Sequence, residues 1–179
     1  MTYPPPSGIP AYNRPAATAR SLATWVLLGY VALFIFFEFF GWLLNGGDFT
    51  VRSANADFRS VIITAMPVLA VLLATYVTPE LSGAKFLAII ALVEYVALLF
   101  FGLITLLVGL GAAFENVDSV REVLGALRYL GMGVAEVALQ AVAALVTFKA
   151  YQKLGGRMPN LQSGPQYPPM QPGQYPPAQ

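Results

Sequence analysis

Four long apolar runs divide the chain, and polar segments separate them. The runs cover residues 21–44, 59–78, 85–112 and 127–150. A helix rises about 1.5 Å per residue, so about 20 apolar residues cross the hydrocarbon core of a bilayer. Because each run reaches this length, the pattern predicts four transmembrane helices. The predicted fold is all-α, an integral membrane four-helix bundle within residues 21–152.

The composition changes the range of functions to consider. Hydrophobic residues make up 57% of the chain and charged residues 11%, whereas about a quarter of residues are charged in soluble domains. The net charge of +1 gives no basis for nucleic-acid binding, and we predict none. The chain has no cysteine and no histidine, so it lacks thiolate chemistry, the commonest metal ligand and the usual general base. We therefore predict no enzymatic activity, no cofactor and no metal site.

Both ends of the chain differ from its apolar middle. Residues 1–20 are rich in proline, alanine and tyrosine, and residues 153–179 in proline, glutamine, glycine and tyrosine. Such segments cannot bury a core, so we predict disordered tails with polyproline-II character. Repeated Tyr-Pro-Pro units could dock onto aromatic-lined grooves of a cytosolic partner, or the tails could simply be solubilising. The C-terminal candidates are Tyr167, Pro168, Pro169, Tyr175, Pro176 and Pro177.

The basic residues predict an orientation. With a cytoplasmic N-terminus and four spans, six of the ten basic residues fall on the inner side and four on the outer side. Cytoplasmic segments of membrane proteins carry an excess of lysine and arginine. We therefore predict a multi-pass protein of the plasma membrane with both termini in the cytoplasm.

The segments between the runs carry local signals. Residues 45–60 contain a Gly-Gly breaker and several charges, and we predict a short exposed connection there. Pro67 interrupts the second run and predicts a kink. Ser119 and Glu122 fit a capping box before the fourth run. Either an amphipathic interfacial helix begins there, or the fourth span starts early and protrudes from the membrane.

Three of the runs contain one glutamate each, namely Glu38, Glu94 and Glu136. An ionisable group inside a membrane is costly unless it is protonated, paired or facing a polar cavity, so it marks a candidate functional site. Counting the helix rise along each run predicts that Glu38 and Glu136 share a depth, and that Glu94 lies near the level of Gln140. These four residues are the candidate intramembrane polar site.

The sequence leaves the role of these glutamates open between three alternatives. No lysine or arginine lies at matching depth within a run, which argues against internal ion pairing. The glutamates could be carboxylic acids that hydrogen-bond a neighbouring helix, a site for a proton or cation, or acceptors for a residue of a partner. Small and polar residues also recur at helical spacing in the fourth run, a pattern typical of buried helix faces in membranes. This stripe comprises Tyr129, Gly133, Glu136, Gln140, Ala144, Thr147 and Tyr151.

A four-span topology with short loops and a Tyr-Pro-Pro-rich tail resembles the MARVEL-type vesicle and junction proteins. With the segment GAKFLAIIALVEY, the chain is also similar to uncharacterised bacterial, actinobacterial-type four-helix membrane proteins. These resemblances imply a bacterial tetraspan unit and no particular substrate. We expect an interaction or accessory protein, scaffold-like, with a membrane-protein partner or a second copy of itself. The alternative is a small proton- or cation-coupled transporter or channel that uses the glutamates.

Overall fold

The computed structural model describes residues 14–77, 80–115, 117 and 119–155. This part of the chain is all-helical, with no strand, as the sequence predicts. Three helices are long and apolar enough to cross a membrane, and α3, with 15 residues, is a shorter apolar helix. The helices are α1 (Arg14–Leu44), α2 (Phe49–Asn55), α3 (Val61–Thr75), α4 (Ala84–Glu115) and α5 (Val120–Lys153).

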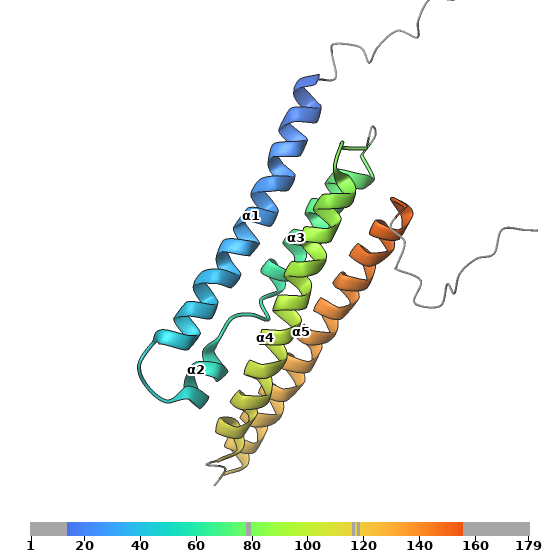
Figure 1. Cartoon of the computed structure of the whole chain (residues 1–179). Helices are drawn as coiled ribbons and strands as arrows, with labels where there is room; N and C mark the ends of the chain where they lie inside the picture. The colour runs from blue at the N-terminus through green and yellow to red at the C-terminus, as the bar shows by residue number, and fades with distance from the viewer. Residues whose placement is uncertain (1–13, 78–79, 116, 118, 156–179) are drawn as a thin grey trace, which may run out of the picture.

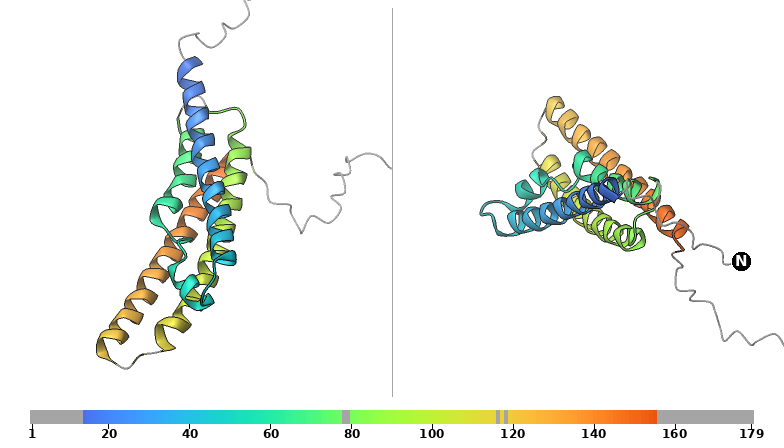
Figure 2. Two further views of the ribbon diagram at one scale, coloured as in Figure 1. Left: turned by 90° about the vertical axis from the view of Figure 1, so that its left-hand side faces the viewer. Right: turned by 90° about the horizontal axis from the view of Figure 1, so that it is seen from above.

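The four longer helices run alternately in opposite directions, so α1 begins and α5 ends toward the same end of the molecule (Figure 1). The short helix α2 lies toward the opposite end. Helix α4 packs against each of the other four helices, and α5 crosses α1 obliquely (Figure 2). The bundle is therefore built around α4. Helix α5 and the segment that contains α2, residues 45–60 (the α2 segment), cover parts of the α4 surface that α1 leaves free.

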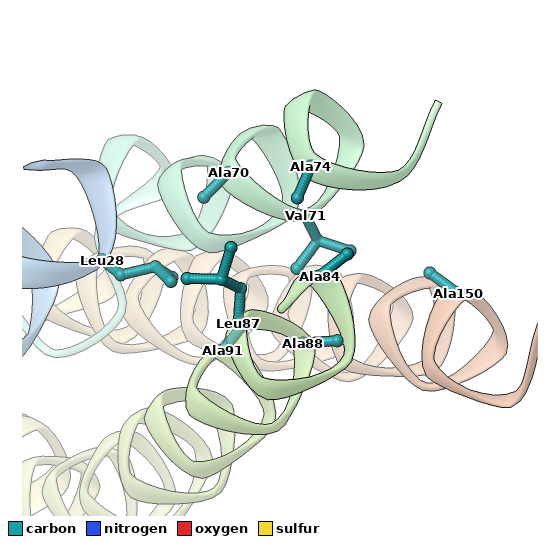
Figure 3. Close-up of a cluster of buried hydrophobic side chains, with 9 residues drawn as sticks. All are labelled: Leu28, Ala70, Val71, Ala74, Ala84, Leu87, Ala88, Ala91 and Ala150. Atoms are coloured by element: carbon teal, nitrogen blue, oxygen red, sulfur yellow. The ribbon is translucent and has the colours of Figure 1, made fainter. Parts of the chain in front are cut away.

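Small side chains line the contact between α3, α4 and the end of α5 (Figure 3). Small residues let helix backbones approach closely, which favours van der Waals packing between helices in lipid. Many large apolar side chains point outward instead, as a lipid-facing surface requires. Six of the nine buried residues in this cluster are alanines: Ala70, Ala74, Ala84, Ala88, Ala91 and Ala150.

A tyrosine of α4 inserts into the backbone of α3 beside its proline. The Tyr95 hydroxyl donates to the carbonyl oxygen of Thr64 at 2.5 Å and accepts from the N–H of Val68 at 3.2 Å. An uninterrupted helix pairs these two backbone groups with each other. Because Pro67 has no N–H and crowds the preceding turn, the hydroxyl supplies a partner where the helix ladder is weakened.

The start of helix α5 shows which of the two structures predicted near Ser119 is present. The predicted capping box is confirmed, because the side chain of Ser119 accepts from the N–H of Glu122 and the Glu122 side chain accepts from the N–H of Ser119. The helix then continues without a break from Val120 to Lys153. The fourth long helix therefore starts early, and the described residues just before it, 117 and 119, belong to no separate helix.

Two predicted boundaries need correction. Residues 14–20, predicted to belong to the N-terminal tail, form the first turns of α1. Their alanines are good helix formers, and a proline in the first turn costs little because its missing N–H has no partner there. The second apolar run was predicted over 59–78, and its described residues are helical from Val61 to Thr75.

The segment at 45–60 is not the exposed connection that its polar composition predicts. It contains α2, which begins at the N-cap Asp48, and it buries Ser53, Ala56, Phe58 and Arg59. The N–H of Thr50 donates to the Asp48 carboxylate at 2.8 Å, and this bond holds the pKa of Asp48 below its usual value.

Contacts to α1 and α4 explain why this segment folds back onto the bundle. Trp42 Nε1 donates to Ser53 Oγ at 3.0 Å, and Arg52 donates to the carbonyl oxygens of Trp42 and Leu43, which close the C-terminal end of α1. The rings of Phe58 and Phe101 stack with their centroids 5.3 Å apart. Aromatic packing and satisfied helix-end carbonyls therefore outweigh the segment's polar composition.

Candidate functional site

Two of the predicted site residues hold the backbone of the segment that precedes α3. The Glu38 carboxylate on α1 accepts from the N–H of Asp57 at 2.8 Å. The Gln140 side chain on α5 donates to the carbonyl oxygen of Phe58 at 2.7 Å and is fully buried. Adjacent residues of one segment are thus bonded from two different helices, which fixes how deeply the segment enters the bundle.

The next residue, Arg59, places its side chain between α4 and α5, against Gly102 and Gly133. A Cβ atom at Gly133 would lie 2.5 Å from Arg59 Nη1, and one at Gly102 would lie 3.1 Å from Arg59 Cγ. Any larger residue at Gly133 would therefore displace the guanidinium group. Glycine at both positions therefore leaves the space that the Arg59 side chain fills.

The guanidinium group of Arg59 is buried but only partly bonded. It is 7% exposed, its Nη2 donates to Tyr129 Oη at 3.2 Å, and it lies over the Tyr129 ring, 5.2 Å from the centroid. Its Nε has no hydrogen-bond partner within the described residues. A buried charge of this kind is costly unless further partners complete its hydrogen bonds.

Arg59 and Glu136 line the same open cavity of about 510 Å³ between the α2 segment and α5. The sequence predicted no lysine or arginine at the depth of the glutamates, but Arg59, the first residue of the second apolar run, folds between α4 and α5 and reaches the level of Gly133. Glu136 forms no hydrogen bond or ion pair with the described residues, although Gly133, one turn away, touches the Arg59 guanidinium. The lining comprises Ala54, Asn55, Ala56, Asp57, Arg59, Gly125, Arg128, Tyr129, Met132, Gly133 and Glu136.

Glu94 is separate from this cavity. Gly102 lies opposite Gln140, since a Cβ at Gly102 would be 3.3 Å from Gln140 Oε1. Because α4 and α5 are antiparallel, Glu94 falls opposite the turn that carries Thr147. Glu94 was predicted near the level of Gln140. It lies about two helical turns from that level, toward the end of the bundle where α4 begins and α5 ends.

The side chain of Glu94 is buried inside the bundle. It is 5% exposed, and neither carboxylate oxygen has a hydrogen-bond partner among the described residues; the same holds for Thr147 Oγ1. The buried side chains of Leu98 and Ala143 lie between this level and that of Gln140. The structure therefore brings Glu38, Gln140 and Glu136 to one polar segment and leaves Glu94 alone in the bundle.

Sequence reasoning missed Arg59, because its position at the start of an apolar run suggested a membrane boundary. A signal for it exists in Gly102 and Gly133, two glycines inside apolar helices that make room for a large side chain. The predicted stripe on the fourth run is partly seen, because Gly133, Gln140 and Thr147 are buried while Tyr129 and Glu136 are half-buried. The tail candidates around Tyr167 and Tyr175 lie outside the described residues.

In the described ranges no three acidic, histidine or cysteine side chains lie close enough to hold a metal ion. The described part of the chain is a helical protein with three helices long and apolar enough to cross a membrane. Comparisons with protein-family models, with curated proteins and with solved structures found no match.

Proposed function

We propose that the chain is a multi-pass plasma-membrane protein in which α1, α3, α4 and α5 form a four-helix membrane bundle. The 15 residues of α3 rise about 22 Å, and the buried segment before it would complete the crossing. Disordered tails would extend from the two termini, both at the end of the bundle where α1 begins and α5 ends.

The charges at one end of the bundle support cytoplasmic termini. At the end where α1 begins and α5 ends, Arg20 donates to the Val77 carbonyl at 2.7 Å, and Lys153 lies 4.7 Å from the centroid of the Tyr76 ring. Lys85 also lies over an aromatic ring there. Lysine and arginine near the ends of spans favour the cytoplasmic side.

The proposed role of this bundle is that of an interaction or accessory protein, scaffold-like in its action. The observation that carries this proposal is that two of the polar groups inside the apolar helices hydrogen-bond the backbone of the chain itself. Glu38 and Gln140 bind backbone groups of residues 57 and 58, and buried Leu98 separates their level from that of Glu94. A bundle without a continuous polar route would act through its outer surface.

The outer surface of α1 supports the same role. Only 11% of its most apolar window is buried within the bundle, so most of this helix is free to contact lipid, a membrane-protein partner or a second copy of the chain. The tails, with their Tyr-Pro-Pro units, would offer a separate contact for cytosolic proteins. Neither contact requires a cofactor or a chemical step.

Extraction in native lipid, followed by mass spectrometry of co-purifying proteins, tests this role. A membrane protein recovered at constant stoichiometry, or a homo-oligomer joined through α1, would support it. A matched pair of variants locates the contact: Phe37→Ala alters the exposed face of α1, and Leu145→Ala alters the exposed face of α5. Recovery of a lone monomer from native lipid would contradict the proposal.

A proton- or cation-coupled transporter is the second candidate, and Glu94 is the observation that favours it. A buried carboxyl group with no hydrogen-bond partner among the described residues is a candidate proton site in a membrane. Proton flux into liposomes, measured for the wild type and for Glu94→Gln, decides between the two. Flux that is present in the wild type and lost in the variant would establish transport, because glutamine keeps the shape but cannot exchange a proton.

A further inference from the structure

We propose that the cavity lined by Arg59, Arg128, Asp57 and Glu136 binds a phospholipid through a headgroup that carries both a phosphate and a primary ammonium, as phosphoethanolamine does. The inference rests on the membrane location and not on the accessory role. The two proposals can therefore fail independently.

The first argument is the incomplete bonding of Arg59. Its Nε is buried and unpartnered among the described residues. Within the same residues the guanidinium group has one hydrogen bond and one ring contact, both with Tyr129. Guanidinium groups bind phosphate oxygens with paired, charge-assisted hydrogen bonds. A phosphate in the cavity would supply the missing partner, and the exposed Arg128 on the same wall would supply a second cation.

The second argument is the balance of charge on the lining. Two guanidinium groups share the cavity with the carboxylates of Asp57 and Glu136. A headgroup with only negative charge would leave both carboxylates facing it without compensation. A headgroup that also carries an ammonium matches both signs, with the phosphate toward the arginines and the ammonium toward the carboxylates.

The third argument is the position and size of the cavity. It extends along α5 from Gly125 to Glu136, across the point where the polar first turns give way to the apolar run. Lipid headgroups lie at this level of a membrane. Its volume of about 510 Å³ falls within the range of about 300–1,000 Å³ found for small-ligand sites.

The fourth argument concerns the acyl chains, and it distinguishes a lipid from free phosphate. Met132 lines the cavity and is exposed. It begins a stripe of exposed residues on one face of α5, at spacings of three or four residues, that continues inward for about 21 Å. The stripe comprises Met132, Ala135, Leu139, Val142 and Val146. A lipid seated in the cavity would lay an acyl chain along it, whereas a soluble phosphate would leave it unused.

Two glycines of α5 provide a matched pair of variants. Gly125 lines the cavity and Gly131 does not, and a Cβ atom at either position would meet nothing within 4 Å. Leucine at each position replaces a helical glycine with a good helix former, so both variants should fold. Only Gly125→Leu places a side chain in the proposed headgroup site.

The experiment measures lipid bound to the full chain by native mass spectrometry, together with the unfolding temperature, as phosphatidylethanolamine is added to delipidated protein. We expect binding to weaken about tenfold or more in Gly125→Leu, as loss of one charge-assisted contact would do, and to be unchanged in Gly131→Leu. Equal binding by these two variants would overturn the proposal.

Two further arms test the headgroup chemistry. Phosphatidylglycerol, which lacks an amine, should bind more weakly than phosphatidylethanolamine, and Glu136→Gln should remove this preference. An unchanged preference in Glu136→Gln would refute the role of the ammonium. Inorganic phosphate and soluble phosphoethanolamine should not raise the unfolding temperature at millimolar concentration, and equal protection by either one would show a site for a soluble phosphate and overturn the lipid assignment.

Discussion

Replacement of Tyr95 by phenylalanine should destabilise the bundle by removing one oxygen atom. The Tyr95 hydroxyl is fully buried and bonds two backbone groups of α3, the Thr64 carbonyl at 2.5 Å and the Val68 N–H at 3.2 Å. A buried polar group left without a partner costs about 1–3 kcal/mol. Partial re-pairing of the two groups within the helix would recover some of that, so we expect a net loss of about 2 kcal/mol.

The measurement is thermal unfolding of the full chain in lipid-like micelles, followed by circular dichroism. A loss of about 2 kcal/mol corresponds to a decrease of several degrees in Tm for a chain of this size. Tyr30→Phe is the matched control, because Tyr30 is exposed and its hydroxyl has no bond to the described residues. It should stay within about 0.5 kcal/mol of the wild type.

A double-mutant cycle with Pro67→Ala tests the reason for the effect. Without the proline, Val68 and Thr64 could pair directly in a regular helix, so Tyr95→Phe should cost less in that background, with a coupling of about 1 kcal/mol. If Tyr95→Phe and Tyr30→Phe lowered Tm equally, the hydroxyl would not be supporting α3 and the reasoning would be refuted. Purely additive effects of the two substitutions would show that the hydroxyl acts independently of Pro67.

Three further predictions concern the packing of the α2 segment and the ends of helices. Gln140→Leu should lower stability by about 1–3 kcal/mol because it leaves the Phe58 carbonyl without its bond, and unchanged denaturation in detergent would contradict it. Gly109→Ala should lower Tm, since the added Cβ would overlap the Tyr129 hydroxyl, whereas Gly111→Ala, which meets nothing within 4 Å, should leave Tm unchanged or raise it. Ser119→Ala should cost about 1 kcal/mol by removing the cap of α5, measurable as a lower Tm, and Ser119→Asp should retain most of the wild-type value.

The sequence predicts the long helices because their information is local. About 20 consecutive apolar residues, a capping box and a central proline are each visible within a short window. The positions of α1, α4 and α5 follow from these signals to within several residues. The helical residues 14–20 were the main error at the N-terminal end, because alanine favours helix even in a proline-containing segment.

The α2 segment could not be predicted in the same way, because the contacts that bury it are distant in the sequence. Gln140 bonds Phe58 across 82 positions and Arg59 bonds Tyr129 across 70. Polar composition alone places such a segment in water. Here its polar groups find partners inside the bundle, so burial costs less than composition suggests.

The candidate site shows the same division between local and distant information. The sequence identified Glu38, Glu136 and Gln140 as polar groups in apolar helices, but it gave them no common partner. The chain itself supplies a partner for two of them, the backbone N–H of Asp57 for Glu38 and the backbone carbonyl of Phe58 for Gln140. Glu136 lines a cavity together with Arg59 and bonds none of the described residues. Glu94 has no such partner among the described residues, and this difference explains why Glu38 is better regarded as a structural acceptor while Glu94 keeps the proton-site alternative open to test.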